Sequence, residues 1–234
     1  MKKTLLPSVV AMAILAGNAS ALTPITDAFN KLSETTWYQY KTGKGKLAAS
    51  GKLSFITKGA PTKYDFSSIE LLTSRPGFNE DWQLTLDLTN TANSKTDAGG
   101  GLMIFNVQDR SDYLYLEYYG TSGVDGGIIV NGKPPAKKGH ISIPAATKKG
   151  SVKITFDKKK KLLSLALSVK NKKQGYEWVD VGNFSPTGKG GDVSGNWDMN
   201  AAGGTFGIQL FGVAFDTAVK TGKITFDNFQ LSAP

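Results

Sequence analysis

The sequence predicts an all-β protein, a two-sheet antiparallel β-sandwich, on two observations. Apolar and polar residues alternate with a period of two along many short segments, as in strands with one buried face. Glycine-rich breaks separate these segments at short spacing, and few stretches have a helical pattern. The candidate strands, in chain order, are 52–57, 82–89, 101–107, 113–120, 127–131, 140–143, 151–157, 162–169, 177–181, 205–213 and 223–231.

Turns are expected where glycine clusters with aspartate or asparagine, at 97–101, 125–127, 131–132 and 188–191. Only the stretch 25–32 has a briefly helical pattern. No linker composition interrupts the series of strands, so we expect a single sandwich domain over 22–234.

The five residues KITFD occur twice, at 153–157 and at 223–227. In both copies the isoleucine and phenylalanine alternate with polar residues, which predicts that Ile154, Phe156, Ile224 and Phe226 are buried. The flanking sequences do not align, whereas a true repeat would be similar over its whole period. The copies are therefore interpreted as two amphipathic strands and not as a duplication.

The first 21 residues have the features of a secretory signal peptide. Lys2 and Lys3 precede an apolar stretch from about 5 to 16, and Ala19-Ser20-Ala21 supplies a small-x-small cleavage site. We expect cleavage after Ala21 and an exported protein, periplasmic or extracellular and bacterial. The chain has no cysteine and one histidine, which excludes disulfides, thiolate chemistry and histidine-rich zinc sites.

Three segments resemble the concanavalin A-like (laminin G-type) jelly roll. They are GKLSF at 51–55 following Trp37, IELLTSRPGFNEDWQLTLDLTN at 69–90, and GKITFDNFQL at 222–231. They are similar to the opening, the leading strand pair and the closing strand of these domains, which occur in lectins, glucanases and polysaccharide-binding modules. The resemblance implies a jelly-roll sandwich, and it bears more on fold than on activity because one fold hosts many functions.

Known catalytic patterns of that superfamily are missing from the sequence. Glucanases of this type carry Glu-x-Asp-x-x-Glu and jelly-roll alginate lyases carry Arg-Glu-Leu and Gln-x-His, and neither pattern occurs here. The nearest carboxylates are Glu80, Asp81 and the isolated Glu117. We therefore favour a non-catalytic glycan-binding or matrix-interaction domain. A polysaccharide hydrolase or lyase on the same scaffold stays open, as does a purely structural envelope protein.

The segment YLYLEYYG predicts a sugar-binding strand. Tyr113, Tyr115, Glu117 and Tyr119 share one face and leucines occupy the other. Aromatic rings cover the apolar faces of sugars, and hydroxyl and carboxylate groups bond their hydroxyls; the plainer reading is that tyrosine is simply a good strand former. Asp87, Gln209 and Trp82 are expected on the same concave face, with Trp82 at its rim.

No cofactor is expected, although the resemblance allows a structural calcium ion. Some sugar-binding relatives use a carboxylate on the terminal strand, and Asp227 occupies the comparable place. Asp97 and Asp125 lie in glycine-rich stretches that offer backbone carbonyls. Calcium needs six to eight oxygen ligands, which no short run supplies, so aspartates that bond their own turn are the simpler reading.

Positive charge is concentrated in one block. The chain carries +9, or +7 without Lys2 and Lys3, and the stretch 133–173 holds 13 lysines and one acid, Asp157. That block is therefore +12 and the rest of the mature chain −5. A hairpin turn is expected at Lys158, Lys159, Lys160 and Lys161, at a basic edge of the sandwich. Lysines can simply protect strand edges, but so large an asymmetry favours a polyanionic partner such as an acidic polysaccharide, and nucleic acid is not expected for an exported protein.

Overall fold

A computed structural model describes residues 22–59, 64–92, 97–119, 123–133, 140–143, 149–171 and 175–234. These residues form strands, turns and loops, and no helix among them is long and apolar enough to cross a membrane. The strands are β1 (Ile25–Asp27), β2 (Trp37–Thr42), β3 (Lys46–Ala49), β4 (Leu53–Thr57), β5 (Tyr64–Leu71), β6 (Trp82–Asn90), β7 (Ala98–Asn106), β8 (Tyr113–Tyr119), β9 (Gly123–Ile129), β10 (His140–Ile143), β11 (Lys149–Asp157), β12 (Leu162–Asn171), β13 (Gly175–Ser185), β14 (Val193–Ser194), β15 (Phe206–Phe215) and β16 (Val219–Ser232).

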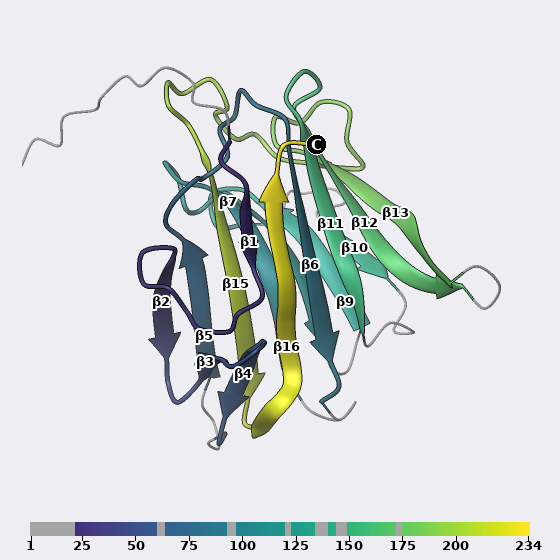
Figure 1. Ribbon diagram of the computed structural model, residues 1–234. Helices are drawn as coiled ribbons and strands as arrows, with labels where there is room; N and C mark the ends of the chain where they lie inside the picture. The colour runs from purple at the N-terminus through teal and green to yellow at the C-terminus, as the bar shows by residue number, and fades with distance from the viewer. Residues whose placement is uncertain are drawn as a thin grey trace, which may run out of the picture.

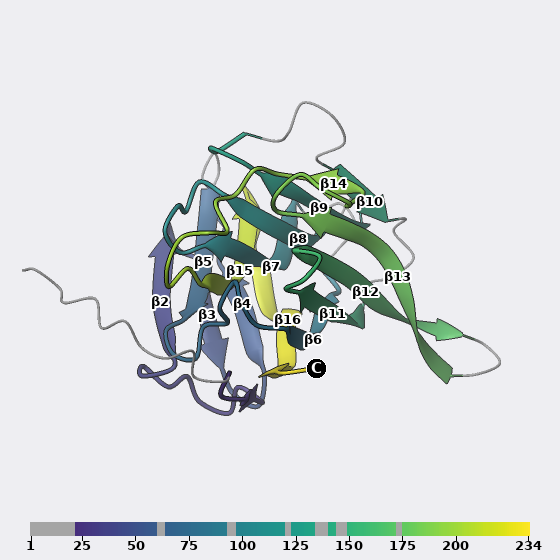
Figure 2. The same cartoon turned by 90° about the horizontal axis from the view of Figure 1, so that it is seen from above.

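The strands form two packed sheets (Figures 1 and 2). The nine-stranded sheet has the order β14-β13-β12-β11-β6-β16-β4-β3, with β1 paired to β16, and faces the viewer in Figure 1. The seven-stranded sheet has the order β10-β9-β8-β7-β15-β5-β2. All described pairs are antiparallel except the two-residue pair of β13 and β14. The predicted two-sheet antiparallel sandwich is confirmed.

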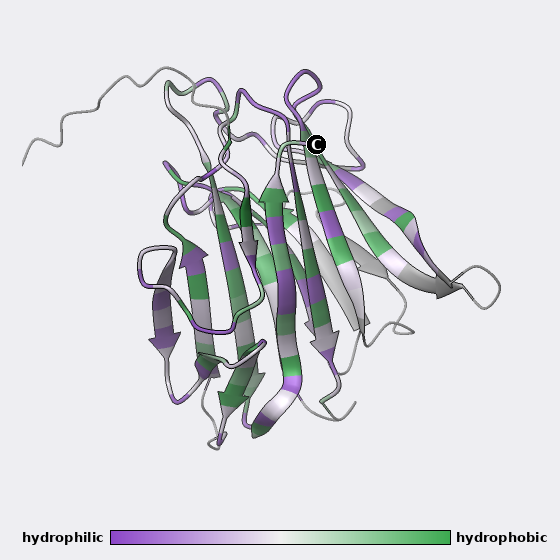
Figure 3. Cartoon of the chain, in the orientation of Figure 1, coloured by the Kyte–Doolittle hydropathy of each residue, from purple (hydrophilic) through white to green (hydrophobic). Residues whose placement is uncertain are grey.

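The two KITFD copies lie in β11 and β16, on either side of β6. Ile154 pairs with Leu84, and Phe226 pairs with Leu88 of the same central strand. All four predicted core residues of the copies are at most 1% exposed, which confirms their inward orientation. Figure 3 shows the resulting alternation of hydrophobic and hydrophilic bands along β16, β6 and β11. The same five residues suit both positions because both strands pair with β6 and bury their apolar side chains in the same core.

Two of the expected glycine turns are strand interior instead. Residues 98–101 belong to β7, and 125–127 belong to β9. A Cβ atom on Gly100 would lie 2.3 Å from Ile224 of the facing sheet, so glycine there allows close packing between the sheets and does not make a turn. The expected turns at 131–132 and 188–191 are confirmed, with positive φ angles at Asn131 and Gly132 and at Gly188 and Gly190.

The expectation of a helical pattern at 25–32 is wrong. Ile25–Asp27 is β1, which pairs with the closing strand β16, and the chain then bends. The carboxylate of Asp27 accepts hydrogen bonds from the backbone N–H of Phe29 (2.6 Å) and from the indole of Trp37 (2.7 Å). These bonds, together with the strand pairing, outweigh a weak local helical pattern over so few residues.

Candidate functional site

The outward-facing side chains of the seven-stranded sheet form the candidate site, here called the seven-stranded face. On β8, Leu114, Leu116 and Tyr118 are buried in the core, while Tyr113, Tyr115 and Glu117 point outward and are partly exposed. The predicted alternation of this strand is therefore confirmed. Tyr119 ends β8, and its side chain lies outside the described residues.

The strand register shows which residues of the neighbouring strands belong to this face. Residues directly opposite each other in antiparallel strands share a face. One row joins five strands of the sheet through consecutive pairs: Tyr115, Met103, Gln209, Glu70 and Tyr38. Gln209 thus lies on the same face as the tyrosines, where the sequence had placed it.

Asp87 and Trp82 do not belong to this face, which corrects their expected placement. Both lie on β6, in the other sheet. Asp87 points out from the far side of the sandwich, and Trp82 is fully buried against Phe156 and Phe206, with ring centroids 6.0 and 5.2 Å away. The alternation along 82–90 already assigns these two residues to opposite faces of one strand, but it does not say which sheet that strand joins.

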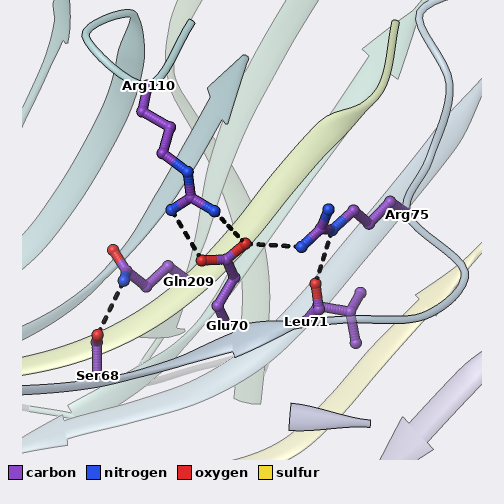
Figure 4. Close-up of polar contacts among 6 residues, drawn as sticks. All are labelled: Ser68, Glu70, Leu71, Arg75, Arg110 and Gln209. Atoms are coloured by element: carbon purple, nitrogen blue, oxygen red, sulfur yellow. Dashed lines mark hydrogen bonds and ion pairs between the residues drawn. The ribbon is translucent and has the colours of Figure 1, made fainter. Parts of the chain in front are cut away.

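The face also holds a carboxylate bonded by two arginines (Figure 4), at the end of β5 and next to the edge strand β2. Arg110 bonds both oxygens of Glu70, at 2.8 and 2.9 Å, and Arg75 bonds one of them at 2.7 Å. The Glu70 side chain is only 5% exposed, whereas that of Arg110 is 59% exposed. The three groups together carry a net charge of +1 at neutral pH, so a buried acid supports an exposed positive centre.

The arginines are positioned by their surroundings as well as by Glu70. The Arg75 Nε donates to the Leu71 carbonyl at 2.9 Å (Figure 4). The Arg110 guanidinium lies 4.8 Å from the centre of the Phe105 ring, a cation–π contact. Phe105 in turn lies flat over Gly207, where any Cβ would meet the ring at 2.1 Å. Glycine at this position is therefore part of how the arginine is supported.

Sequence reasoning missed Glu70, Arg75 and Arg110. The strand β5 was not recognised because its inward positions include Asp65 and Ser67, which are buried and polar. Asp65 accepts hydrogen bonds from the Lys44 N–H and the Thr57 hydroxyl, and Ser67 accepts one from the Leu47 N–H, so neither side chain needs water. The usable signal was the outward set Tyr64, Phe66, Ser68 and Glu70, which alternates at a period of two but with its aromatic residues on the solvent side.

Aromatic rings flank the charged centre on the side of β2, β5 and β15. Tyr64 contacts Phe66 and Phe215, with ring centroids 6.0 and 5.0 Å apart, and Phe66 also contacts Tyr40 and Phe211 at 6.2 and 5.9 Å. Tyr40, Tyr64 and Phe215 are all more than 40% exposed. On the other side, Tyr113 and Tyr115 contact each other at 6.4 Å. The face thus carries two aromatic groups, one on β8 and one around the start of β5, together with the polar residues Ser68, Gln209 and Glu70.

Polar groups on the face include both hydrogen-bond donors and acceptors. Gln209 donates from its amide nitrogen to the Ser68 hydroxyl at 2.8 Å, beside Glu70 (Figure 4). Burial raises the pKa of Tyr113. Burial, with smaller contributions from the charge of Glu117 and from Tyr113 and Tyr40, also raises the pKa of Tyr64. Both tyrosines therefore keep their hydroxyl protons, and so remain hydrogen-bond donors, to higher pH than free tyrosine.

The lysine turn is the four-residue connection between β11 and β12, Lys158–Lys161, as the sequence predicted. Asp157 closes the turn by accepting the N–H groups of Lys159 and Lys160, and these bonds lower the pKa of its carboxyl. The Lys161 ammonium donates to Asn200 at 2.9 Å, and Lys160 lies 3.3 Å from Asp157.

The lysine turn borders a surface hollow of about 480 Å³. Lys159, Lys160 and Lys161 line it together with Lys189 from a neighbouring loop. The expected single basic edge is only partly present among the described residues. Lys149 begins β11 and the lysine turn follows its end, so lysines of the block lie at opposite ends of the sandwich.

The described surroundings of Asp227 do not fit a calcium ion. Its nearest partners are the Lys52 ammonium at 3.7 Å and the Asn228 N–H at 2.9 Å, both positive or hydrogen-donating groups. The neighbouring Asp87 accepts from the Asn228 amide at 2.7 Å. In the described part of the chain no three histidine, cysteine or acidic residues gather as metal ligands would. Calcium prefers a shell of six to eight oxygens.

Comparison with solved structures identifies the fold. Lectin II from Ulex europaeus aligns with a TM-score of 0.59 at 10% identity, over 91% of this chain and 99% of the lectin. An endo-1,3-β-glucanase from Streptomyces sioyaensis aligns with a TM-score of 0.56 at 10% identity, over 93% and 100% of the two chains. The lumenal domain of VIP36, in a form bound to Ca²⁺ and Man2, aligns with a TM-score of 0.55 at 10% identity, over 90% and 87%.

These likenesses confirm the resemblance to the concanavalin A-like sandwich. At such low identity they establish the fold alone. No protein-family model matches the chain, and no curated protein matches its sequence.

Proposed function

We propose that this chain is a non-catalytic glycan-binding protein that holds an acidic polysaccharide across the seven-stranded face. The observation that supports this most is the exposed guanidinium of Arg110, fixed by a buried Glu70 on a face that also carries exposed and partly exposed aromatic rings. The solved structures that share the fold include lectins and a glucanase, which agrees with a carbohydrate ligand.

The chemistry of the face favours sugars that carry carboxylates. Tyrosine rings cover the apolar faces of pyranoses, and the Gln209 amide and the tyrosine hydroxyls offer hydrogen bonds to sugar hydroxyls. The net positive charge of the Arg75–Glu70–Arg110 group attracts a uronate, since arginine forms charge-assisted bonds with carboxylates. A neutral glycan would gain the stacking but not the ionic contacts.

A second source of attraction is the lysine turn. Its four ammonium groups, with Lys189 beside them, extend the positive field at one end of the sandwich. Lysine acts as a point charge and raises the encounter rate with a polyanion more than it selects one. In the proposed arrangement the seven-stranded face supplies specificity, and the lysine turn supplies long-range attraction.

Affinity electrophoresis in gels that contain polygalacturonate, with neutral dextran gels for comparison, tests the proposal. The mature protein should be retarded by polygalacturonate and not by dextran. A Tyr113→Ala, Tyr115→Ala double variant should lose most of that retardation, and its thermal unfolding should change little because both rings are partly exposed. Tyr176→Ala, on the opposite sheet, is the matched control and should behave as the parent. Unchanged retardation of the double variant would refute the proposed face.

The proposed function includes export. The mature chain is proposed to begin at Leu22 and to form one sandwich over 22–234. Sequencing the N-terminus of protein recovered from the periplasm or medium of its host should give Leu22 first. Recovery of the chain only from the cytoplasm, with Met1 intact, would contradict export without affecting the binding proposal.

A glycan-cleaving enzyme is the second candidate, supported by one feature of the register. In the strand register Asp125 of β9 is the partner of Glu117 of β8, so two acidic residues occupy opposed positions on neighbouring strands. Glu70 is unsuited to pair with Glu117, because two strands separate them, about 14 Å at the usual strand spacing.

Assays for new reducing ends and for unsaturated products, on a panel of plant, algal and bacterial polysaccharides, separate the two functions. Turnover that Glu117→Gln abolishes would establish the enzyme and overturn the non-catalytic assignment. Binding without turnover would support the first proposal.

A further inference from the structure

A hollow of about 310 Å³ opens on the outer side of the nine-stranded sheet, away from the site described above. It is lined by side chains or backbone of six residues: Asp87, Thr89, Gly150, Ser151, Ser168 and Tyr176. They come from β6, β11, β12 and β13, four consecutive strands of the sheet (Figure 1). Its volume is at the small end of the range for ligand pockets, which is about 300–1,000 Å³.

The floor of the hollow consists of small residues. The register pairs Asp87 with Ser151 on β11, and Ser168 with Trp178 on β13. Serine side chains are short and Gly150 has none, so the sheet surface is low at this point, between Asp87 and Tyr176. A flat ring can therefore approach the backbone of the sheet here, which it cannot do over the leucine-rich inner side.

Two exposed aromatic residues stand on one side of the hollow, here called the Tyr176–Trp178 wall: Tyr176 lines the hollow, and Trp178 lies opposite the lining residue Ser168 in the strand register. Tyr176 is 65% exposed and Trp178 is 44% exposed, and both belong to β13. Trp37, Trp82 and Trp197 are at most 3% exposed, so Trp178 is the one exposed tryptophan of the four in the sequence. The Lys153 ammonium lies 4.7 Å from the centre of the Trp178 ring, which holds the indole in place against the sheet. An exposed tyrosine and tryptophan beside a polar hollow are the usual means of binding sugar rings.

The opposite wall presents a fixed acceptor. Asp87 accepts hydrogen bonds from the Ser151 hydroxyl and, at 2.7 Å, from the Asn228 amide. These bonds fix the carboxylate, and each oxygen has capacity for a further bond from a ligand hydroxyl. Carboxylate–hydroxyl bonds are charge-assisted and about twice as strong as neutral ones.

Charge at the hollow selects against an acidic ligand. Asp87 is the one charged residue among the six that line it, and Asp227 lies opposite Asp87 in the register. None of the six lining residues is basic, so an acidic sugar would meet the Asp87 carboxylate and no cationic partner among them.

We propose that this hollow is a second carbohydrate site, which binds a neutral pyranose of an oligosaccharide between Asp87 and the Tyr176–Trp178 wall. The ring stacks on the aromatic wall, and its hydroxyls donate to Asp87. The site lies on the opposite side of the sandwich from the seven-stranded face and is independent of it. If both faces bind, one protein molecule joins a neutral glycan to an acidic one.

Titration with neutral hexasaccharides of glucose, mannose and galactose, followed by tryptophan fluorescence and by calorimetry, tests the site. At least one should give a saturable change in emission, since the exposed tryptophan adjoins the hollow. Trp178→Phe should lose the optical signal while calorimetry still detects binding. Tyr176→Ala and Asp87→Asn should each weaken binding at least fivefold, and tetragalacturonate should give no response.

Tyr38→Ala is the matched control for Tyr176→Ala, because Tyr38 is similarly exposed, at 55%, on the opposite sheet. It should leave hexasaccharide binding unchanged. The proposal is overturned if none of the neutral hexasaccharides binds, or if Tyr176→Ala binds as the parent does. It is also overturned if the chain forms a dimer that Tyr176→Ala dissociates, since this wall would then be an interface between copies. None of these results bears on the acidic-polymer site.

Discussion

Glu70 carries its negative charge on a strand whose outward neighbours are mostly aromatic. Removing a carboxylate from water costs several kcal/mol unless partners replace the lost hydration. Arg75 and Arg110 do so with three hydrogen bonds, and both remain partly in contact with solvent. The two partners therefore depend on the ion pair to different degrees. Glu70 can be buried only because the arginines bond it, whereas Arg110 keeps most of its contact with water and does not need Glu70.

That inequality predicts different costs for the two partners. Glu70→Ala leaves two guanidinium groups facing each other and should lower the free energy of unfolding by about 2–4 kcal/mol, somewhat less than for a fully buried pair because both arginines keep part of their hydration. Arg110→Ala should cost about 1 kcal/mol or less, as for exposed ion pairs, because Glu70 keeps Arg75. Urea titrations of both variants measure these values. Equal losses of unfolding free energy would mean that Arg110 stabilises the fold as much as Glu70 does.

Tyr118 gives a second prediction at the residue scale. Burial raises the pKa of Tyr118 to about 12, against about 10 in an unfolded chain. Because the folded-state pKa is the higher one, the stabilising effect of the neutral phenol is complete below pH 10. It is lost as the pH rises toward 12, and a difference of two units corresponds to roughly 2–3 kcal/mol.

Tyr118→Phe removes this titration, so its stability should fall less than that of the parent between pH 10 and 12. At pH 7 the variant should be as stable as the parent or more so, since the buried hydroxyl has no hydrogen-bond partner among the described residues. Denaturant unfolding at pH 7, 10 and 11.5 provides the comparison. Parallel loss of stability in both proteins would show that Tyr118 does not titrate in this range.

At the scale of elements, the two KITFD strands share β6 between them and supply four fully buried side chains. Truncating Ile154, Phe156, Ile224 or Phe226 to alanine should each cost about 2–5 kcal/mol, the usual range for large core residues. Thr155→Ala, on the outward side of β11, is the matched control and should cost well under 1 kcal/mol. Near-neutral effects at all four core positions would contradict the inward assignment.

The same elements show what the sequence could and could not predict. β6, β8, β11 and β16 were found because their apolar residues alternate cleanly and face one common core. β2 and β5 were missed because their exposed sides carry Tyr38, Tyr40 and Tyr64. A period-two pattern identifies a strand, but an outward aromatic residue and an inward one look alike in it.

The candidate site was therefore predictable only along single strands. Tyr113 and Tyr115 of β8 were placed on the correct side by alternation alone. Gln209 was placed on their face, whereas Asp87 was placed there wrongly, because the sheet to which a strand belongs depends on long-range pairing. Arg75 and Arg110 lie in loops after β5 and β7, and they meet at Glu70 only once the sheet has formed.

At the scale of the whole molecule, exposed lysines lie at both ends of the sandwich. The lysine turn lies at the end where β16 terminates, since Phe156 pairs with Trp82 and Ser232 pairs with Gln83 of the same strand β6. The opposite end, where β16 begins, carries exposed lysines of its own at Lys220 and Lys223. The two ends therefore allow a comparison in which the number of charges removed is equal and only their position differs.

Replacing Lys158, Lys159, Lys160 and Lys161 by glutamine should weaken retention on a polygalacturonate column by several-fold at low salt. Exposed charges are screened beyond about 8 Å at physiological ionic strength, so the difference between parent and variant should shrink as salt is added.

The control replaces Lys44, Lys46, Lys220 and Lys223, all exposed at the other end, with the same change in net charge. If the control loses as much retention as the turn variant, only the total charge matters. If neither loses any, the lysines serve solubility and the acidic polymer is held by the seven-stranded face alone. A selective loss in the turn variant, with both variants unfolding as the parent does, would assign the long-range attraction to the end of the sandwich that carries the lysine turn.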